Sequence, residues 1–163
     1  MEVQVYGEAQ NQLDDKGRVN VPRRFQPLFF SGGFLTRAFN GKSLVFYPTS
    51  IWDAFQQRLK DIKTRMADQD PAFFLKAELI TGNLNRFLSC GVQITELDGQ
   101  NRLSIPPTLR HWAYLKKEVT LIGVGDTVEI WDTETWHAYN AEHLTIEELE
   151  KSMSALSMRT PSA

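Results

Sequence analysis

The sequence predicts an α+β fold in which one short β-rich module occurs twice, with helices between and after the copies. Two observations predict it. First, residues 12–55 align without a gap on residues 96–139, at an offset of 84, with nine identities in 44 positions. Second, apolar and polar residues alternate within each copy as in a half-buried strand, whereas the intervening segment has apolar residues at helical spacing. The 163 residues are therefore expected to form a duplicated module with a helical spacer.

The first element of each module is a short strand followed by a proline. Apolar residues alternate with polar ones over 19–21 and again over 103–105. Proline cannot donate to a strand ladder, so it ends each strand, and its fixed φ suits the first turn of a helix. Short helices are expected over 23–30 and 107–114, and a further strand is possible before each of these motifs.

A β-hairpin follows each short helix. In the first copy it joins an apolar run at 34–39 to a return strand at 44–47 through the Asn-Gly dipeptide at 40–41, a strong turn signal because both residues tolerate positive φ. In the second copy the strands are expected over 119–124 and 128–131. The glycines at the second turn thus belong to a hairpin, since no helix follows as a dinucleotide-binding loop would require.

The rest of the chain is predicted to be helical. Ser50 can cap a helix that runs to about Met66, and the Asp-Pro pair at 70–71 opens a second helix that ends near Gly82. The segment 145–148, Thr-Ile-Glu-Glu, has the form of a capping box and predicts a C-terminal helix.

Composition excludes several classes of protein. With 18 basic and 20 acidic residues the formal charge is −2, so the chain has no uniformly basic coat. Residues 1–117 nevertheless hold 16 of the basic residues and 11 of the acidic ones, an asymmetry that hints at a polyanionic partner. The lone Cys90 is expected to be a small core residue, and a cytosolic location follows from the lack of disulfide, signal peptide and membrane span.

Residues of a catalytic or metal centre are not apparent. None of His111, His137 and His143 lies at ligand spacing from another histidine or cysteine, and each is expected on a helix surface. Neither a phosphate-binding loop nor a nucleophile elbow occurs. We therefore expect no enzyme activity, no cofactor and no metal.

The polar feature retained in both copies is an Asp-x-x-x-Arg loop. Asp14 and Arg18 form it in the first copy, and Asp98 and Arg102 form it in the second. The carboxylate can hold the guanidinium by paired hydrogen bonds. In one interpretation the pair only fixes the turn, and in the other the aspartate orients an arginine that reads guanine edges or grips phosphate.

Other cations lie near the first loop. Lys16 is inside it, and Arg23 and Arg24 follow the strand, which makes the first loop the better phosphate anchor of the two. The tryptophans could stack on bases, but the equivalent positions of Trp52 and Trp136 at predicted helix starts favour a shared packing role.

The chain resembles the MraZ family of bacterial transcriptional regulators, which is part of the wider AbrB-like group. The resemblance rests on Leu-Asp-Asp-Lys-Gly-Arg-Val-Asn-Val-Pro at 13–22, Leu-Asp-Gly-Gln-Asn-Arg-Leu-Ser-Ile-Pro-Pro at 97–107, and the segments 117–126 and 129–131. It covers about residues 4–145. The sequence departs from the family at Asn101, where the family usually has glycine.

This resemblance implies duplicated AbrB/MraZ-like β-barrel modules with flanking helices. The modules would be DNA-binding units at 8–50 and 92–135, with a helical spacer at 51–91 and a C-terminal helical extension at 136–163. It also implies a cytoplasmic, nucleoid-associated regulator, expected to repress its own cell-division and cell-wall operon.

The partners implied are double-stranded DNA and further copies of the chain. The resemblance implies a ring-shaped homo-oligomer on short direct repeats of the promoter. Arg18, Arg102 and Lys16 are the expected DNA contacts, with Arg23 and Arg24 as further phosphate candidates. An alternative is a non-catalytic structural or protein-binding ring scaffold, in which the loops are turn pins or subunit contacts.

Overall fold

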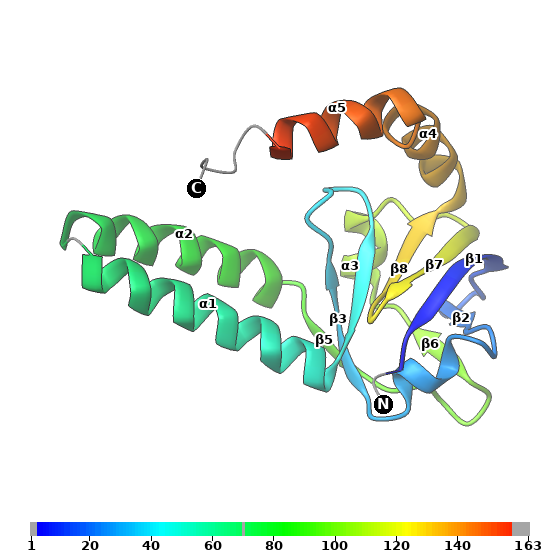
Figure 1. The fold of residues 1–163 in the computed structure, drawn as a ribbon. Helices are drawn as coiled ribbons and strands as arrows, with labels where there is room; N and C mark the ends of the chain where they lie inside the picture. The colour runs from blue at the N-terminus through cyan, green and yellow to red at the C-terminus, as the bar shows by residue number, and fades with distance from the viewer. Residues whose placement is uncertain (1–2, 70, 158–163) are drawn as a thin grey trace.

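A six-stranded antiparallel sheet forms the centre of the computed structural model, which describes residues 3–69 and 71–157 (Figure 1). The strand order is β1-β7-β8-β4-β3-β5. Its strands are β1 (Val5–Gln12), β3 (Gly33–Arg37), β4 (Leu44–Pro48), β5 (Gln93–Thr95), β7 (Glu118–Gly125) and β8 (Val128–Asp132). A separate two-stranded ribbon pairs β2 (Arg18–Asn20) with β6 (Arg102–Ser104). The predicted α+β class is confirmed, as are both hairpins, β3–β4 and β7–β8.

The strand pairing joins the two halves of the chain. Strand β1 pairs with β7 along its whole length, and β4 pairs with β8 at the middle of the sheet. The middle of the β4–β8 ladder matches Val45 with Glu129, and the middle of the β2–β6 ladder matches Val19 with Leu103. Both pairs are separated by 84 residues. The sheet order therefore reads alike from either end when that shift is applied.

The β-barrel expected for each module is not closed. The edge strands β1 and β5 are not joined by a ladder among the described residues, so the sheet stays open. The physical reason is the exchange of partners, because strands from both halves build one continuous sheet instead of closing on themselves.

One hydrophobic core lies between the sheet and the ribbon. Val19 and Leu103 of the ribbon have no exposed surface, and Phe29 stacks on Phe46 of β4 with ring centroids 3.9 Å apart. Burying a side chain of this size stabilises a fold by roughly 1.5–3 kcal/mol. The core thus fixes the inner face of the ribbon and leaves its outer face to solvent.

The helices differ in length from the prediction. They are η1 (Gln26–Phe29), α1 (Thr49–Gln69), α2 (Pro71–Ser89), α3 (Pro107–Trp112), α4 (Thr133–His143) and α5 (Ile146–Ser157). The first short helix is a single 3₁₀ turn, and α2 continues past Gly82 because a glycine is tolerated inside a helix when neighbours such as Leu88 are buried. The expected Asp70 cap lies outside the described residues.

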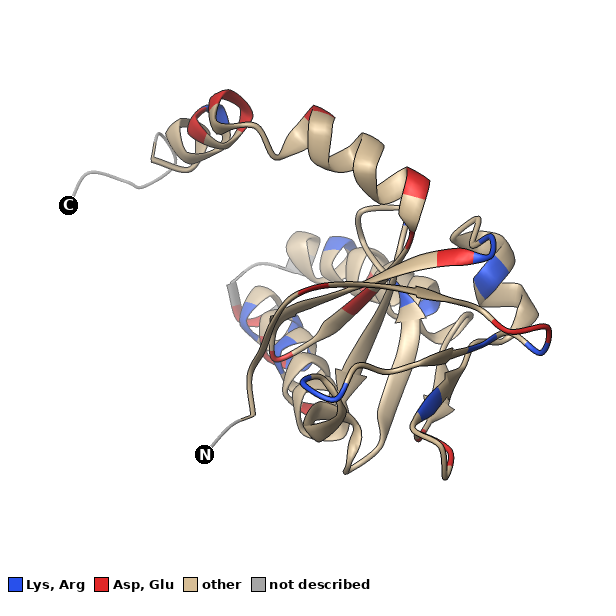
Figure 2. Ribbon diagram, turned by 90° about the vertical axis from the view of Figure 1, so that its right-hand side faces the viewer, with Lys and Arg blue, Asp and Glu red and all other residues tan. Residues whose placement is uncertain are grey.

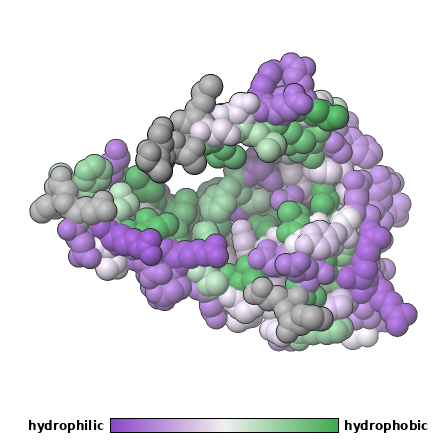
Figure 3. All heavy atoms as spheres, in the orientation of Figure 1, coloured by the Kyte–Doolittle hydropathy of each residue, from purple (hydrophilic) through white to green (hydrophobic). Residues whose placement is uncertain are grey.

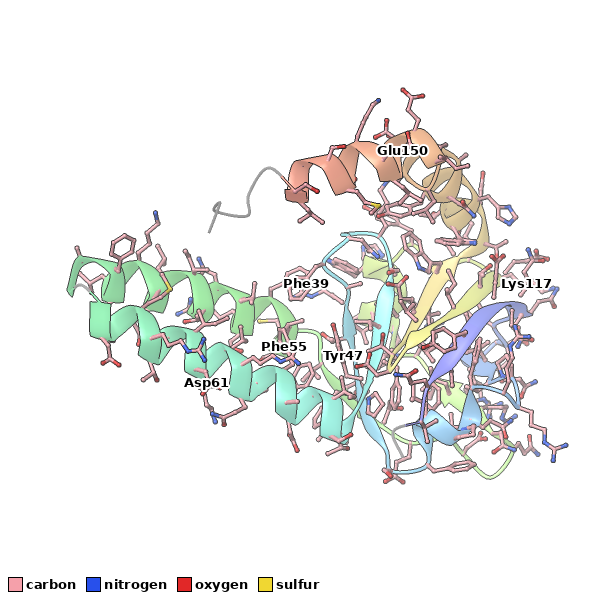
Figure 4. All side chains as sticks on the ribbon, in the orientation of Figure 1. Phe39, Tyr47, Phe55, Asp61, Lys117 and Glu150 are labelled. Carbon is pink, nitrogen blue, oxygen red and sulfur yellow. The ribbon has the colours of Figure 1, made fainter. Side chains whose placement is uncertain are left out.

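Helices α1 and α2 form a hairpin that projects from the sheet (Figure 1). Phe39, Tyr47 and Phe55 pack where α1 leaves the sheet, with the rings of Tyr47 and Phe55 6.3 Å apart (Figure 4). Cys90 follows α2 and is exposed, so the prediction of a core cysteine is wrong. The short connection from α2 to β5 runs over the surface and leaves its side chain in solvent.

The packing role of the equivalent tryptophans is confirmed. Trp52 and Trp136 are each the fourth residue of their helix and are each 8 % exposed. Trp52 stacks on Phe34 at 4.9 Å, and Trp136 packs on Trp131 at 5.3 Å. Both rings therefore fasten a helix to the hairpin that precedes it.

The C-terminal helix α5 stands off the sheet (Figure 1). Thr145 Oγ1 accepts a hydrogen bond from the Glu148 N–H at 3.3 Å, as the capping box predicts. None of the residues of α5 is buried. Within 3–69 and 71–157, none of the helices combines the length and the apolar character that crossing a membrane requires.

Close packing at Gly33 generates the first testable prediction. A methyl group on Gly33 would lie 2.2 Å from the Tyr47 carbonyl oxygen and 2.7 Å from the Phe46 ring. The backbone oxygen cannot move without breaking the β3–β4 ladder. We expect Gly33→Ala to lower the free energy of unfolding by about 1–3 kcal/mol in urea titrations.

Gly99→Ala is the matched control for this prediction. A methyl group there meets no atom within 4 Å. Its unfolding midpoint should stay at the wild-type value or rise slightly, since alanine restricts the unfolded chain. Equal midpoints for the two variants would contradict the packing argument.

Candidate nucleic-acid interface

Asp14 organises the first Asp-x-x-x-Arg loop through both carboxylate oxygens. Its Oδ1 accepts hydrogen bonds from the backbone N–H groups of Lys16 and Arg18, each at 2.9 Å. Its Oδ2 accepts from Nε and Nη2 of Arg18, each at 2.7 Å. One carboxylate thus shapes the turn and holds the guanidinium in a single orientation.

Asp98 repeats this arrangement in the second loop. Its Oδ1 accepts from the N–H groups of Gln100 and Arg102 at 2.9 Å, and its Oδ2 accepts from Arg102 Nε at 2.8 Å. The side chains of Arg18 and Arg102 are 26 % and 25 % exposed. Each arginine is therefore both held by protein and open to a ligand.

Both loops turn through a residue with positive φ. Gly17 has φ 74° and Asn101 has φ 58°, and each N–H donates to the carbonyl of the loop aspartate at 2.9 Å. Asparagine visits this left-handed region more readily than other residues with a Cβ. The departure from glycine at Asn101 consequently leaves the second loop in the same form as the first.

The two loops are tied to one another by the ribbon. The Val21 N–H donates to the Asn101 carbonyl at 3.0 Å, and the Ile105 N–H donates to the Gly17 carbonyl at 2.9 Å. Each loop thus receives a hydrogen bond from the strand end of the other half. The loops lie at the two ends of one antiparallel ribbon.

The ribbon has one buried and one exposed face. Side chains alternate along a strand, so residues next to the buried Val19 and Leu103 point outward. We call their set the outer ribbon face, and it consists of Arg18, Asn20, Arg102 and Ser104. The register places Arg18 opposite Ser104 and Asn20 opposite Arg102, so the two arginines occupy diagonal positions.

The other predicted cations have different surroundings. Lys16 is exposed at the tip of the first loop, and Arg23 is exposed just after β2. Arg24 turns to β1, where Nη2 donates to the Glu8 carbonyl and the guanidinium lies 5.0 Å from the Phe25 ring centroid. The structure thus brings Lys16 next to Arg18 and places Arg24 against the edge strand.

Three residues beside these loops were not singled out from the sequence. Asn20 and Ser104 complete the outer ribbon face, and strand alternation alone was sufficient to find them. Arg110 of α3 lies against Gly17 in the first loop, a contact between segments far apart in the chain that no local pattern announces.

The histidine prediction is confirmed, since His111, His137 and His143 are all exposed on helices. A search of the described residues for three or more His, Cys, Asp or Glu side chains that could hold a metal ion finds none. The polar groups gathered at the ribbon are donors, which suit an anionic ligand.

Hydrogen bonds lower the pKa of both loop carboxyls. The side-chain hydrogen bond from Arg18, followed by the backbone N–H groups of the loop, lowers the pKa of Asp14 from 3.8 to about 2. At Asp98 the Arg102 backbone N–H is the largest cause of a pKa that also lies below 3.8. Both aspartates are thus charged wherever the protein is folded near neutral pH.

The lowered pKa of Asp14 predicts a pH dependence of stability. The folded state holds the charged carboxylate more tightly than the unfolded state does, so its stabilisation is complete above about pH 4. It is lost as the pH falls from 3.8 towards 2. Asp14→Asn should therefore show a flatter fall of Tm between pH 4 and pH 2 than the wild type.

Asp15→Asn serves as the control for this measurement. Asp15 is exposed and, among the described residues, has neither a hydrogen bond nor an ion pair through its side chain. Its Tm should follow the wild-type pH profile. If Asp14→Asn gave that same profile as well, the stabilising role of the loop carboxylate would be refuted.

Comparison with known proteins identifies the family. A family model described as "MraZ protein, putative antitoxin-like" matches residues 90–157. Two relatives named transcriptional regulator MraZ come from Alkaliphilus oremlandii and Alkaliphilus metalliredigens. They are 33 % and 34 % identical over 151 residues, which is 92 % of this chain and 96 % of each relative.

A third relative with the same name, from Lactiplantibacillus plantarum, is 33 % identical over 137 residues, covering 84 % of this chain and 88 % of its own. The similarity thus spans both loops, the helical spacer and nearly the full length of each relative. The resemblance carried by the two Asp-x-x-x-Arg loops is confirmed, and the chain belongs to the MraZ family.

Proposed function

We propose that the protein is a sequence-specific DNA-binding transcriptional regulator without catalytic activity. The observation that carries this proposal is the outer ribbon face, where Arg18 and Arg102 are each held by an aspartate and each remain open to a ligand. The relatives named transcriptional regulators support it. DNA binding would place the protein in the cytoplasm on the nucleoid.

The shape of the ribbon suits the major groove. B-DNA admits a two-stranded β-ribbon there, and arginine is the commonest reader of guanine through its O6 and N7 atoms. A guanidinium has five N–H donors. Asp14 takes one from Nε and one from Nη2 of Arg18, which leaves the Nη1 edge for a base. Because the aspartate fixes the side chain beforehand, little conformational entropy is lost on binding.

The same proposal includes a duplicated architecture. Residues 8–50 and 92–135 are two copies of one DNA-binding module, joined by the spacer 51–91 and followed by the extension 136–163. Matching hydrogen bonds in the two loops support it, as do ladder midpoints whose partners are 84 residues apart. In this arrangement each copy supplies one loop to a shared ribbon.

Self-association is a further part of the proposal, in the form of a homo-oligomeric ring. Exposed apolar side chains lie on α2 and α5, where Figure 3 shows hydrophobic surface on the facing sides of these helices. On α2 they include Phe73, Leu75 and Leu79, which are 50 %, 72 % and 62 % exposed. Apolar area of this kind favours contact with another copy.

A ring explains how few contacts per subunit could suffice. Head-to-tail contacts present the same ribbon at regular spacing, which suits direct repeats in the promoter of the protein's own operon. Linked sites raise avidity by orders of magnitude without new contacts. Repression would follow if the bound ring covers the promoter.

A second candidate function is a protein scaffold in which the ring does not bind DNA. The exposed apolar faces of α2 and α5 favour it, because they need a protein partner whether or not DNA binds. In that case the loop pairs would only fix turns or make subunit contacts. A footprint of the purified protein on the DNA upstream of its gene separates the two functions.

Removal of Arg18 tests the DNA-binding proposal. Arg18→Ala should weaken binding to the upstream DNA by about 1–3 kcal/mol, or roughly 5- to 150-fold, because one base-reading contact is lost. The loss should be much smaller on unrelated DNA. Fluorescence anisotropy at one fixed salt concentration measures both, and Tm checks that the variant is folded.

Arg58→Ala on α1 is the control, since this arginine is exposed and far along the sequence from both loops. It should bind as the wild type does. Wild-type affinity of Arg18→Ala for the upstream DNA would refute the assignment, and breakdown of the oligomer by Arg18→Ala would favour the scaffold.

Charge placed on α2 tests self-association. Leu75 and Leu79 are one helical turn apart, and Leu75→Glu together with Leu79→Glu should reduce the mass measured by light scattering. Binding to DNA with several repeats should weaken as avidity is lost. Phe30→Glu, at a side chain 74 % exposed beside η1, should keep the wild-type mass. An unchanged mass in the α2 variant would exclude this face from the subunit interface.

A further inference from the structure

We propose that Arg110 is a third DNA-contacting arginine, which grips a backbone phosphate beside the first loop. This inference rests on the proposed DNA binding. It concerns a residue of α3, outside both Asp-x-x-x-Arg motifs, that the fold brings into the first loop. The ligand class is a phosphodiester, not a base.

The contact between Arg110 and Gly17 places the charge inside the loop. A methyl group built on Gly17 would lie 2.5 Å from Cζ, 2.6 Å from Nε and 2.9 Å from Nη1 of Arg110. The guanidinium therefore occupies the space where a side chain of residue 17 would be. The positive charge of Arg110 consequently lies between the positions of Lys16 and Arg18.

The guanidinium of Arg110 has no protein acceptor in the described structure. Its Nε is buried and without a hydrogen-bond partner. Both Nη nitrogens also lack a partner among residues 3–69 and 71–157, yet they are not among the buried unpaired atoms, so they reach solvent. Arg18 and Arg102, in contrast, each have an aspartate.

An unpaired and partly buried cation beside other cations is unfavourable in the free protein. Leaving a polar group buried without a partner costs free energy, and like charges repel. Lys16 and Arg18 add to the local positive charge, and Asp14 is already engaged by Arg18. An anion at this point would satisfy all three cations, and a phosphate has the oxygens to do so.

The second loop lacks an equivalent of this arginine. The residue 84 positions before Arg110 is Gln26, whose Nε2 donates inward to the Val21 carbonyl at 2.9 Å. The position of Gly17 is taken by Asn101, which brings a side chain of its own. The ribbon therefore has one strongly cationic end and one weakly cationic end.

Unequal ends give the ribbon a direction. A ribbon with an approximate two-fold axis could enter a groove in either orientation with similar contacts. A phosphate gripped at the first loop alone makes one orientation more stable than the other. Arg110 thereby contributes orientation along the DNA, whereas the diagonal arginines contribute base recognition.

The test compares Arg110→Gln with Arg18→Ala in the full chain. Binding to the upstream duplex and to an unrelated duplex of equal length is measured by anisotropy from about 50 to 200 mM salt. Arg110→Gln should weaken both complexes alike, by roughly threefold to tenfold, and reduce the slope of log K against log salt by about 1. Arg110→Lys, which keeps the charge, should retain the wild-type slope.

Arg86→Gln is the matched control, because Arg86 is an exposed arginine whose Nη1 donates to Asn83 within α2. It should leave affinity and slope unchanged. If Arg110→Gln fails to fold, as judged by Tm, Arg110→Met takes its place and keeps the apolar stem against Gly17.

Different failures separate this inference from the proposed function. Wild-type affinity and slope for Arg110→Gln, while Arg18→Ala loses cognate binding, would overturn the role of Arg110 alone. Weaker binding with an unchanged slope would make Arg110 a support of the loop and overturn the phosphate contact. If the wild-type protein bound neither duplex, both proposals would fall.

Discussion

The antiparallel pairing of β2 with β6 is the interaction on which the rest of the structure depends. It is only three residues long on each side, yet it joins segments 84 residues apart. Its two flanking hydrogen bonds, from Val21 to Asn101 and from Ile105 to Gly17, attach each loop to the other half. Burial of Val19 and Leu103 beneath it fixes which face looks outward. Without this ribbon the two loops would have no common surface.

Charge placement matters more here than total charge. The chain has a net charge of −2, and the C-terminal helices α4 and α5 appear mainly acidic in Figure 2. At the ribbon, however, each loop carboxylate is used up by its own arginine and by backbone N–H groups. The carboxylate lowers repulsion between the arginine and its surroundings while leaving outward N–H donors free. A negative protein can thus present a surface made of hydrogen-bond donors to a polyanion.

Local patterns predicted the elements well, and tertiary contacts decided the rest. Turn chemistry and strand alternation placed the hairpins and the loop pairs, because both are set by a few neighbouring residues. Helix α2 passes Gly82 since burial of its neighbours outweighs the propensity cost of one glycine. Cys90 is exposed, and the barrel stays open, because both depend on how distant segments pair. The contact of Arg110 with Gly17 belongs to this second class and was not foreseen.

A duplicated module poses a problem of direction, and small differences between the copies solve it. Two identical loops on a two-fold ribbon would favour a palindromic partner, because each end would make the same contacts. Here Lys16, Gly17 and the guanidinium of Arg110 stand at one end, while Gln100 and Asn101 stand at the other. Glycine at position 17 is what admits the arginine, since any side chain there would collide with it. Sequence divergence between the copies therefore gives polarity to a surface whose backbone remains nearly symmetric, and polarity is what direct repeats require of a reader.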